Sequence, residues 1–282
     1  MVTDAERAEH AARLRGLLYL ACPDAPAPAI TATAEAIVEH AEETPQNPVL
    51  QAAQLGQPIY AAAQLNLSGA DLTGADLSGA DLHGADLTDT NLTDTNLHGA
   101  NLTRANLHGA NLHGADLTRA YLNGAYLHGA YLIRADLTGA DLTGADLHGA
   151  NLHGAYLFRA DLHGANLHGA DLTGAYLSGA YLIRADLHGA NLHGADLIRA
   201  DLSGANLTNT DLANADLTNA NLMGAQFTSG VNMHLPAGAT WGSRTRWPDD
   251  LASVVAERSD EVSPGVYRVR GGQNPDRSTV GM

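Results

Sequence analysis

The most regular feature of the sequence is a leucine at every fifth position across residues 65–229. The series runs from Leu67 to Leu222 without a change of register, and Phe227 takes the place of the last leucine. Each leucine is usually preceded by Ala and then Asp, Asn or Tyr, and it is followed by a variable residue and usually Gly. About 33 such units follow one another, so this part of the chain is an internal repeat.

A period of five fits neither a helix nor a continuous strand. On an α-helix each five-residue step advances about 500°, so the leucines would circle the axis, and each glycine would cost about 1 kcal/mol relative to alanine. On a strand, an odd period sends successive leucines to opposite faces. The pattern instead predicts three extended residues followed by a corner at the glycine, with Ala and Leu pointing inward and the residue between them pointing outward.

Corners at this spacing predict a chain that winds into coils, each pairing its backbone with the next about 4.8 Å away. The inward Leu and Ala then form a narrow apolar column in which each coil covers its neighbours. Representative residues of this predicted core are Leu72, Leu112, Leu157, Leu197 and Phe227.

The repeat unit reads almost literally as A-[DN]-L-x-x at residues 70–74 (Ala-Asp-Leu-Thr-Gly) and 110–114 (Ala-Asn-Leu-His-Gly). In this motif the chain resembles the pentapeptide-repeat proteins over about three-fifths of its length. The resemblance implies an all-β solenoid, a right-handed quadrilateral β-helix of about eight coils of 20 residues, or a rod near 40 Å long. Residues 240–248, with Thr245-Arg246-Trp247-Pro248, also look like the tail that often follows such arrays.

Residues 1–64 are predicted to form an α-helical segment. Apolar residues recur at helical spacing from Ala8 to Ala21, and Pro23 ends this stretch. Further helices are predicted over residues 33–43 and after Pro48. Because an open coil would expose unpaired backbone groups and leucines, we expect this segment to form an N-terminal cap on the array at residues 65–229.

Residues 230–282 lose the five-residue register and are predicted to form a small C-terminal cap. Trp241 and Trp247 supply bulk to seal the last coil. Pro248 is predicted to begin a short helix that ends near Arg258, and residues 265–270 alternate as a short strand does. The tail from residue 271 onward is expected to be disordered.

The array is acidic, with 17 Asp against six Arg in a chain whose formal net charge is −16. A nucleic-acid-binding surface needs a basic stripe, so direct nucleic-acid binding is not expected. Cys22 is the only cysteine and permits no intramolecular disulfide. The apolar stretch at residues 16–22 is too short to cross a membrane. We therefore expect a cytoplasmic protein with no membrane contact.

Positions 20 apart share one column of the surface if four units make a coil. Five histidines fall in such a column, on a face that we expect to be free of arginine: His108, His128, His148, His168 and His188. Imidazole binds metals, but outward side chains in a row do not converge on a point, so no metal site is predicted and these five are only weak candidates. Protonation of the stacked rings is expected to lower stability below about pH 6.

The opposite face combines aromatic, aliphatic and arginine side chains. These are Tyr156, Phe158, Arg159, Tyr176, Ile198 and Arg199, with Tyr181 and Ile183 around the next corner. Exposed residues of these types are typical of interface hot spots, and we predict that they contact a protein partner or a second copy of the chain. The alternative is that the tyrosines stack on one another and the arginines neutralise nearby Asp.

No catalytic residue and no cofactor site is predicted, because Asp is the outward residue of the repeat itself and a filled convex rod has no deep pocket. One functional interpretation is a rigid acidic rod that serves as a protein–protein interaction or scaffold module. The other, implied by the resemblance, is a DNA mimic that binds DNA gyrase or topoisomerase IV and protects it from quinolone-type poisons. The acidity of the array favours such a mimic, although DNA itself carries about one charge per 1.7 Å.

Overall fold

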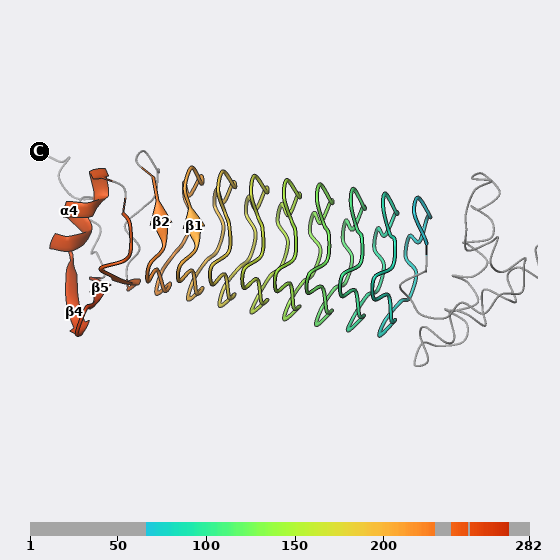
Figure 1. Ribbon diagram of the computed structural model, residues 1–282, viewed down its shortest axis with the longest axis horizontal. Helices are drawn as coiled ribbons and strands as arrows, with labels where there is room; N and C mark the ends of the chain where they lie inside the picture. The colour runs from blue at the N-terminus through green and yellow to red at the C-terminus, as the bar shows by residue number, and fades with distance from the viewer. Residues whose placement is uncertain (1–65, 229–237, 248, 271–282) are drawn as a thin grey trace, which may run out of the picture.

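The computed structural model describes residues 66–228, 238–247 and 249–270. The predicted N-terminal helical segment and the predicted disordered tail lie outside the described residues. Figure 1 shows the array as a straight stack of coils with the C-terminal helix and strands at one end.

Each five-residue unit makes one extended piece and one turn, and four units close one coil. Parallel backbone pairs join residues 20 apart, such as Asp71 with Asn91 and Tyr156 with Tyr176. The pattern continues across residues 66–228 without an inserted loop. The four-unit coil is therefore present as expected. Near the C-terminal end, the extended pieces lengthen into two parallel strands, β1 (Asn206–Leu207) and β2 (Gln226–Phe227).

Two sets of backbone hydrogen bonds hold each unit in place. Between coils, the Leu112 amide donates to the Tyr131 carbonyl at 2.7 Å, and the Tyr131 amide donates to the Ala110 carbonyl at 2.9 Å. Within the corner, the Ala115 amide donates to the Leu112 carbonyl at 3.1 Å. This pattern recurs along the array. The backbone polar groups around the apolar core are therefore hydrogen-bonded and do not need partners from the core side chains.

The core is a single column of leucine and alanine that runs the length of the array. The predicted core residues Leu112, Leu157 and Leu197 have no exposed surface, and Phe227 closes the column with 6% exposed. Three units carry Thr in the place of Ala, namely Thr90, Thr95 and Thr210, and all three are buried. Their hydroxyls donate to leucine carbonyls 23 residues earlier, at 2.8, 2.9 and 2.7 Å. The hydroxyl is thus satisfied inside an apolar column, which explains why Thr replaces Ala there.

Corner residues adopt positive φ, where glycine is favoured but Arg, Asp and Asn also occur, as at Asp89 (φ 53°) and Arg184 (φ 56°). The side chain of a non-glycine corner lies along the rod, over the corner of the next coil. A β-carbon built on Gly204 would lie 3.4 Å from Cγ of Arg184, and one built on Gly109 would overlap the Asp89 carboxylate. Each arginine or aspartate corner except Arg199, which precedes Asn219, has a glycine at the same corner of the next coil.

The C-terminal segment continues the rod and then departs from it. The Leu222 amide donates to the Thr240 carbonyl at 2.7 Å, and the Phe227 amide donates to the Arg246 carbonyl at 2.9 Å. A three-stranded antiparallel sheet follows in the order β3-β5-β4, with α4 preceding β4. Its elements are β3 (Thr240–Gly242), α4 (Asp249–Glu257), β4 (Ser259–Ser263) and β5 (Val266–Val269). The helix after Pro248 and the strand near residues 265–270 were both predictable, whereas β4 was not.

Aromatic rings join this segment to the end of the core column. Trp247 stacks on Phe227 with ring centroids 5.2 Å apart and an interplanar angle of 3°. Trp241 meets Trp247 edge-on at 6.1 Å and stacks on Tyr267 at 4.7 Å. The indole Nε1 of Trp247 is buried and has no hydrogen-bond partner among the described residues. Ring stacking, and not a hydrogen bond of the indole, therefore holds Trp247 against the end of the column.

Candidate interaction surfaces

The five predicted histidines form a continuous stack along one face. We call this the histidine face; it contains the units centred on Leu107, Leu127, Leu147, Leu167 and Leu187. Successive ring centroids lie 5.2, 4.9, 4.8 and 5.0 Å apart, with interplanar angles of 12°, 10°, 7° and 10°. At the C-terminal end of the stack, His188 Nδ1 lies 2.6 Å from the Thr208 hydroxyl oxygen. The structure thus brings all five rings together.

One arginine reaches the histidine face although none falls in its columns. Arg104 ends the preceding face, and its Cγ would lie 3.7 Å from a β-carbon built on Gly124, in the next coil. It lines a depression of about 480 Å³ together with Thr88, Asn106, His108, Tyr126, His128 and Asp146. No arginine falls in the units of this face, but Arg104 at its border lines the depression beside His108 and His128 because its corner side chain points along the rod.

The stacked rings do not create a metal site. In nearly parallel stacked rings the nitrogens lie in separate planes side by side, whereas a metal needs ligands that converge from several directions. In the part of the chain that the structure describes, no group of three or more His, Cys, Asp or Glu side chains is placed to hold a metal ion.

The face opposite the histidines carries the predicted aromatic cluster. We call it the aromatic face; it contains the units centred on Leu117, Leu137, Leu157, Leu177, Leu197 and Leu217. Tyr156 stacks on Tyr176 with centroids 4.9 Å apart and an interplanar angle of 5°. The guanidinium of Arg159 lies 5.0 Å from the centroid of the Phe158 ring. Tyr156, Phe158 and Tyr176 are 45%, 43% and 47% exposed, so the cluster remains open to solvent.

The remaining predicted interface residues border this cluster. Ile198 is half-buried and Arg199 is exposed, two coils beyond Phe158 and Arg159. Around the corner, Tyr181 is exposed and Ile183 is half-buried. The Arg184 side chain rests on Gly204. The structure therefore places all eight predicted interface residues on two adjoining faces, with the aromatic face holding six of them.

A second set of exposed tyrosines was not singled out from the sequence. Tyr121, Tyr126 and Tyr131 are 54%, 56% and 51% exposed and occupy three successive faces of one coil. They form a belt around the rod, not a column along it. The signal was present in the sequence as Tyr at the outward Asp/Asn position in three consecutive units, which a search by columns alone does not detect.

Most acidic side chains serve the repeat itself. Within a unit, Asp116 accepts hydrogen bonds from the amide and hydroxyl of Thr118 at 2.9 and 2.6 Å. Between coils, Asn166 Nδ2 donates to Asp146 at 2.9 Å, which places an amide between successive carboxylates. These bonds explain the abundance of Asp and Asn without any catalytic role.

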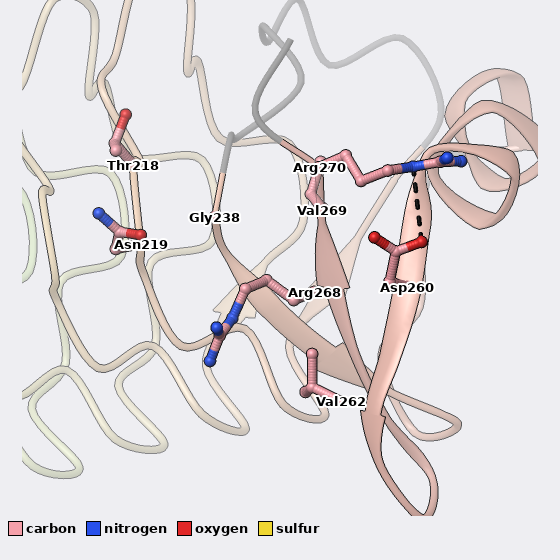
Figure 2. Close-up of a pocket in the computed structure, with 8 residues that line it drawn as sticks. All are labelled: Thr218, Asn219, Gly238, Asp260, Val262, Arg268, Val269 and Arg270. Carbon is pink, nitrogen blue, oxygen red and sulfur yellow. Dashed lines mark ion pairs between the residues drawn. The ribbon is translucent and has the colours of Figure 1, made fainter.

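A cleft of about 470 Å³ separates the last described coil from the C-terminal sheet (Figure 2). Thr218 and Asn219 line it from the array, and Arg268 extends into it from β5. Arg270 pairs with Asp260 at 3.7 Å and donates to the Glu257 carbonyl. The charged side chains of the cleft are exposed, so it does not enclose a ligand.

No helix among the described residues is long and apolar enough to span a membrane.

Comparison with known families finds one match. Residues 63–94, 85–125, 120–157, 160–198 and 195–230 match the family model of pentapeptide repeats, in eight copies. No curated protein sequence matches the chain.

Several solved structures are similar. HetL, a pentapeptide repeat protein involved in heterocyst differentiation regulation from the cyanobacterium Nostoc sp. strain PCC 7120, is 37% identical. The match covers 68% of this chain and 94% of HetL, with a TM-score of 0.38. Rfr23 from the cyanobacterium Cyanothece 51142 is 33% identical over 38% of this chain and 90% of its own, with a TM-score of 0.33. QnrB1, a plasmid-mediated fluoroquinolone resistance protein, is 20% identical over 69% of this chain and 96% of its own, with a TM-score of 0.23.

Proposed function

The chain belongs to the pentapeptide-repeat family, and from this premise we propose that it is a non-catalytic acidic rod that binds a protein partner through its aromatic face. The family fold is a right-handed quadrilateral β-helix, which presents flat faces of outward side chains in fixed columns. A rigid surface of this kind suits recognition because little side-chain and backbone order has to be gained on binding.

The exposed aromatic cluster is the observation that carries the proposal. Outside this cluster and the belt of Tyr121, Tyr126 and Tyr131, the outward positions are largely Asp, Asn, Thr, Ser and His, which are well solvated. Tyr156, Phe158 and Tyr176 instead leave large apolar rings in water, beside the exposed guanidinium of Arg159. Tyr and Arg in a patch are the residue types that dominate binding energy at protein interfaces. Tyr156 and Tyr176 stack on each other but both rings remain exposed to solvent. The alternative, that the tyrosines serve only to pack on one another, therefore does not account for this exposed surface.

The interior supports a role without catalysis. Leu and Ala fill the column so completely that its members have almost no exposed surface. The hollows at the surface are open, and the carboxylates of the array are hydrogen-bonded within the repeat. A rod built in this way offers faces for contact and no enclosed site for a substrate.

A comparison of three proteins tests the proposal: the wild type, the double variant Phe158→Asp with Ile198→Asp, and a matched control. The control is Ile133→Asp with Thr173→Asp, which changes two positions of the same kind, also 40 residues apart, on the neighbouring face. Each tagged protein is used to capture partners from an extract of the producing cells. We expect the wild type and the control to enrich the same proteins and the aromatic-face variant to lose them at least tenfold. Equal capture by all three would refute the proposal.

A DNA mimic is the second candidate, and the acidity of the rod favours it. The array holds 17 Asp against six Arg, and such a rod would be steered to a basic groove. Its net negative charge of 17 − 6 = 11 over a rod ~40 Å long is nevertheless only about half as dense as that of a duplex, which carries about one charge per 1.7 Å. A supercoiling assay with purified gyrase, with and without a quinolone, separates the two functions. Inhibition or protection at micromolar protein in low salt would favour the mimic.

A further inference from the structure

Arginine recurs on the aromatic face with a period of two coils. Arg119, Arg159 and Arg199 are 40 residues apart in one corner column, and they make up half of the six arginines in the array. Between them the same column holds Gly139 and Gly179. Within the described residues, none of the three arginines forms an ion pair, although the rod is acidic.

Each of these arginines shares its coil with an acceptor that it does not contact. Three positions before Arg119, Arg159 and Arg199 stand Asp116, Tyr156 and Asp196, on the other edge of the same face. A carboxylate and an aromatic ring are both natural partners for a guanidinium. Asp116 instead bonds within its own unit, to the amide and hydroxyl of Thr118. The face therefore carries arginines along one edge and Asp or Tyr along the other, and in the part of the chain that the structure describes no ion pair joins the two edges, although Arg159 lies over its own Phe158 ring.

Two identical faces can be packed by a two-fold axis in only two ways. If the axis is perpendicular to the rods, the two chains run antiparallel. Each column then faces the same column of the other copy, which sets Asp against Asp. If the axis runs along the rod, the chains are parallel and the two edges exchange places. Arg119 then lies beside Asp116 of the other copy, Arg199 beside Asp196, and Arg159 beside Tyr156, all on the same coil. Only the second arrangement sets arginine against aspartate, which it does at two of the six coils, while Asp136 and Asp216 face Gly139 and Asn219.

Resting on the function proposed above, we propose that the partner of the aromatic face is a second copy of this chain, with the two rods side by side, parallel and in register. The surface repeat favours this partner over others. Side chains on this face recur once per coil, every ~4.8 Å along the rod. A partner that contacts successive coils in the same way needs side chains at the same spacing, and a second copy of the rod has it. Phe158 and Tyr156 of one copy then face Tyr156 and Phe158 of the other near the centre.

The size of the contact sets the expected affinity. The face from Asp116 to Asp216 spans six coils, or ~29 Å at ~4.8 Å per coil. A strip of this length and one face wide makes a contact smaller than the standard interface, which buries about 800 Å² per partner. The dimer is therefore expected to dissociate in the micromolar range and to weaken as salt screens its arginine pairs.

A charge exchange tests the pairing. One variant carries Arg119→Asp with Arg199→Asp, and the other carries Asp116→Arg with Asp196→Arg. By sedimentation equilibrium each variant alone should dimerise at least tenfold more weakly than the wild type, whereas an equimolar mixture should recover the dimer. Recovery also shows that both variants are folded. Asp171→Arg with Asp211→Arg, on the neighbouring face, is the control and should dimerise as the wild type does.

Crosslinking tests the direction of the chains, in a Cys22→Ser background. In parallel rods, Thr118→Cys chains meet at the same coil and should be joined by a crosslinker that spans ~10 Å, the spacing of packed sheets. In antiparallel rods centred between Tyr156 and Tyr176, the product would appear only when Thr118→Cys and Thr218→Cys chains are mixed. That outcome would overturn the parallel arrangement.

A wild-type chain that stays monomeric at 10 to 100 times the expected micromolar range would overturn the dimer itself. The function proposed above would survive that result if the aromatic-face variant still lost its captured partners. The proposed function would fail as well if the aromatic-face variant captured the same partners as the wild type. Failure of the dimer and failure of the proposed function are therefore distinguishable.

Discussion

The carboxylate of Asp89 lies over Gly109, in the next coil, so closely that a β-carbon on Gly109 would overlap it. Gly129, one coil further, has the same backbone conformation (φ 65° against 64°) and nothing within 4 Å of the position of its missing β-carbon. The two glycines therefore differ in the side chain above them and hardly at all in their backbone.

Gly109→Ala is expected to be more destabilising than Gly129→Ala. Both substitutions incur the cost of a left-handed residue, about 1–2 kcal/mol, partly offset by a loss of entropy in the unfolded chain. Only Gly109→Ala must also displace the Asp89 carboxylate, for which we expect about 1 kcal/mol more. Thermal unfolding of the two variants measures the difference. Adding Asp89→Gly to Gly109→Ala should remove it, and an equal loss in both variants would contradict the contact.

Leu157→Ala is expected to cost about 2–5 kcal/mol, because it leaves a cavity in a core that the leucines of each four-unit coil fill. Leu157 has no exposed surface and lies beneath the aromatic cluster. Leu157→Met, which conserves volume, should cost less than about 1.5 kcal/mol. Chemical denaturation reports both values, and a small effect of the alanine would mean that the column can collapse locally.

Trp247→Ala should destabilise the C-terminal end of the rod by about 3 kcal/mol or more, since it removes the ring that covers Phe227. Trp247→Phe keeps a stacked ring and removes a buried N–H that has no partner among the described residues. It should therefore lie within about 1 kcal/mol of the wild type. Limited proteolysis of the C-terminal segment distinguishes the two variants. Equal protection in both would show that the stack does not hold this segment.

Much of the array could be predicted because each unit repeats one local solution. The spacing of Leu72, Leu112 and their equivalents determines which side chains point inward, and the 20-residue coil then places Tyr156 next to Tyr176. The direction of the corner side chains was not predictable in this way. Arg104 reaches the histidine face because a positive-φ corner sends its side chain along the rod, a property of the backbone that the column pattern does not contain.

The C-terminal segment was harder to predict because it has no period. Pro248 indicates the start of α4, and alternation indicates β5, but nothing local shows that residues 259–263 pair with β5 as a third strand. That pairing depends on how the segment meets the last coil through Trp241 and Trp247. Non-local contacts of this kind are outside the reach of pattern reasoning on one sequence.

Because four units close one coil, the way in which such an array grows is restricted. A duplication of 20 residues lengthens every column and leaves each face as it was. A duplication of one unit of five would turn everything downstream by a quarter of a circle, so that Tyr156 and Tyr176 would meet different neighbours if it fell between them. The number of five-residue units can therefore change without altering the residue columns on each face only in steps of four. The length of the gene and the composition of the faces are thus linked in this protein.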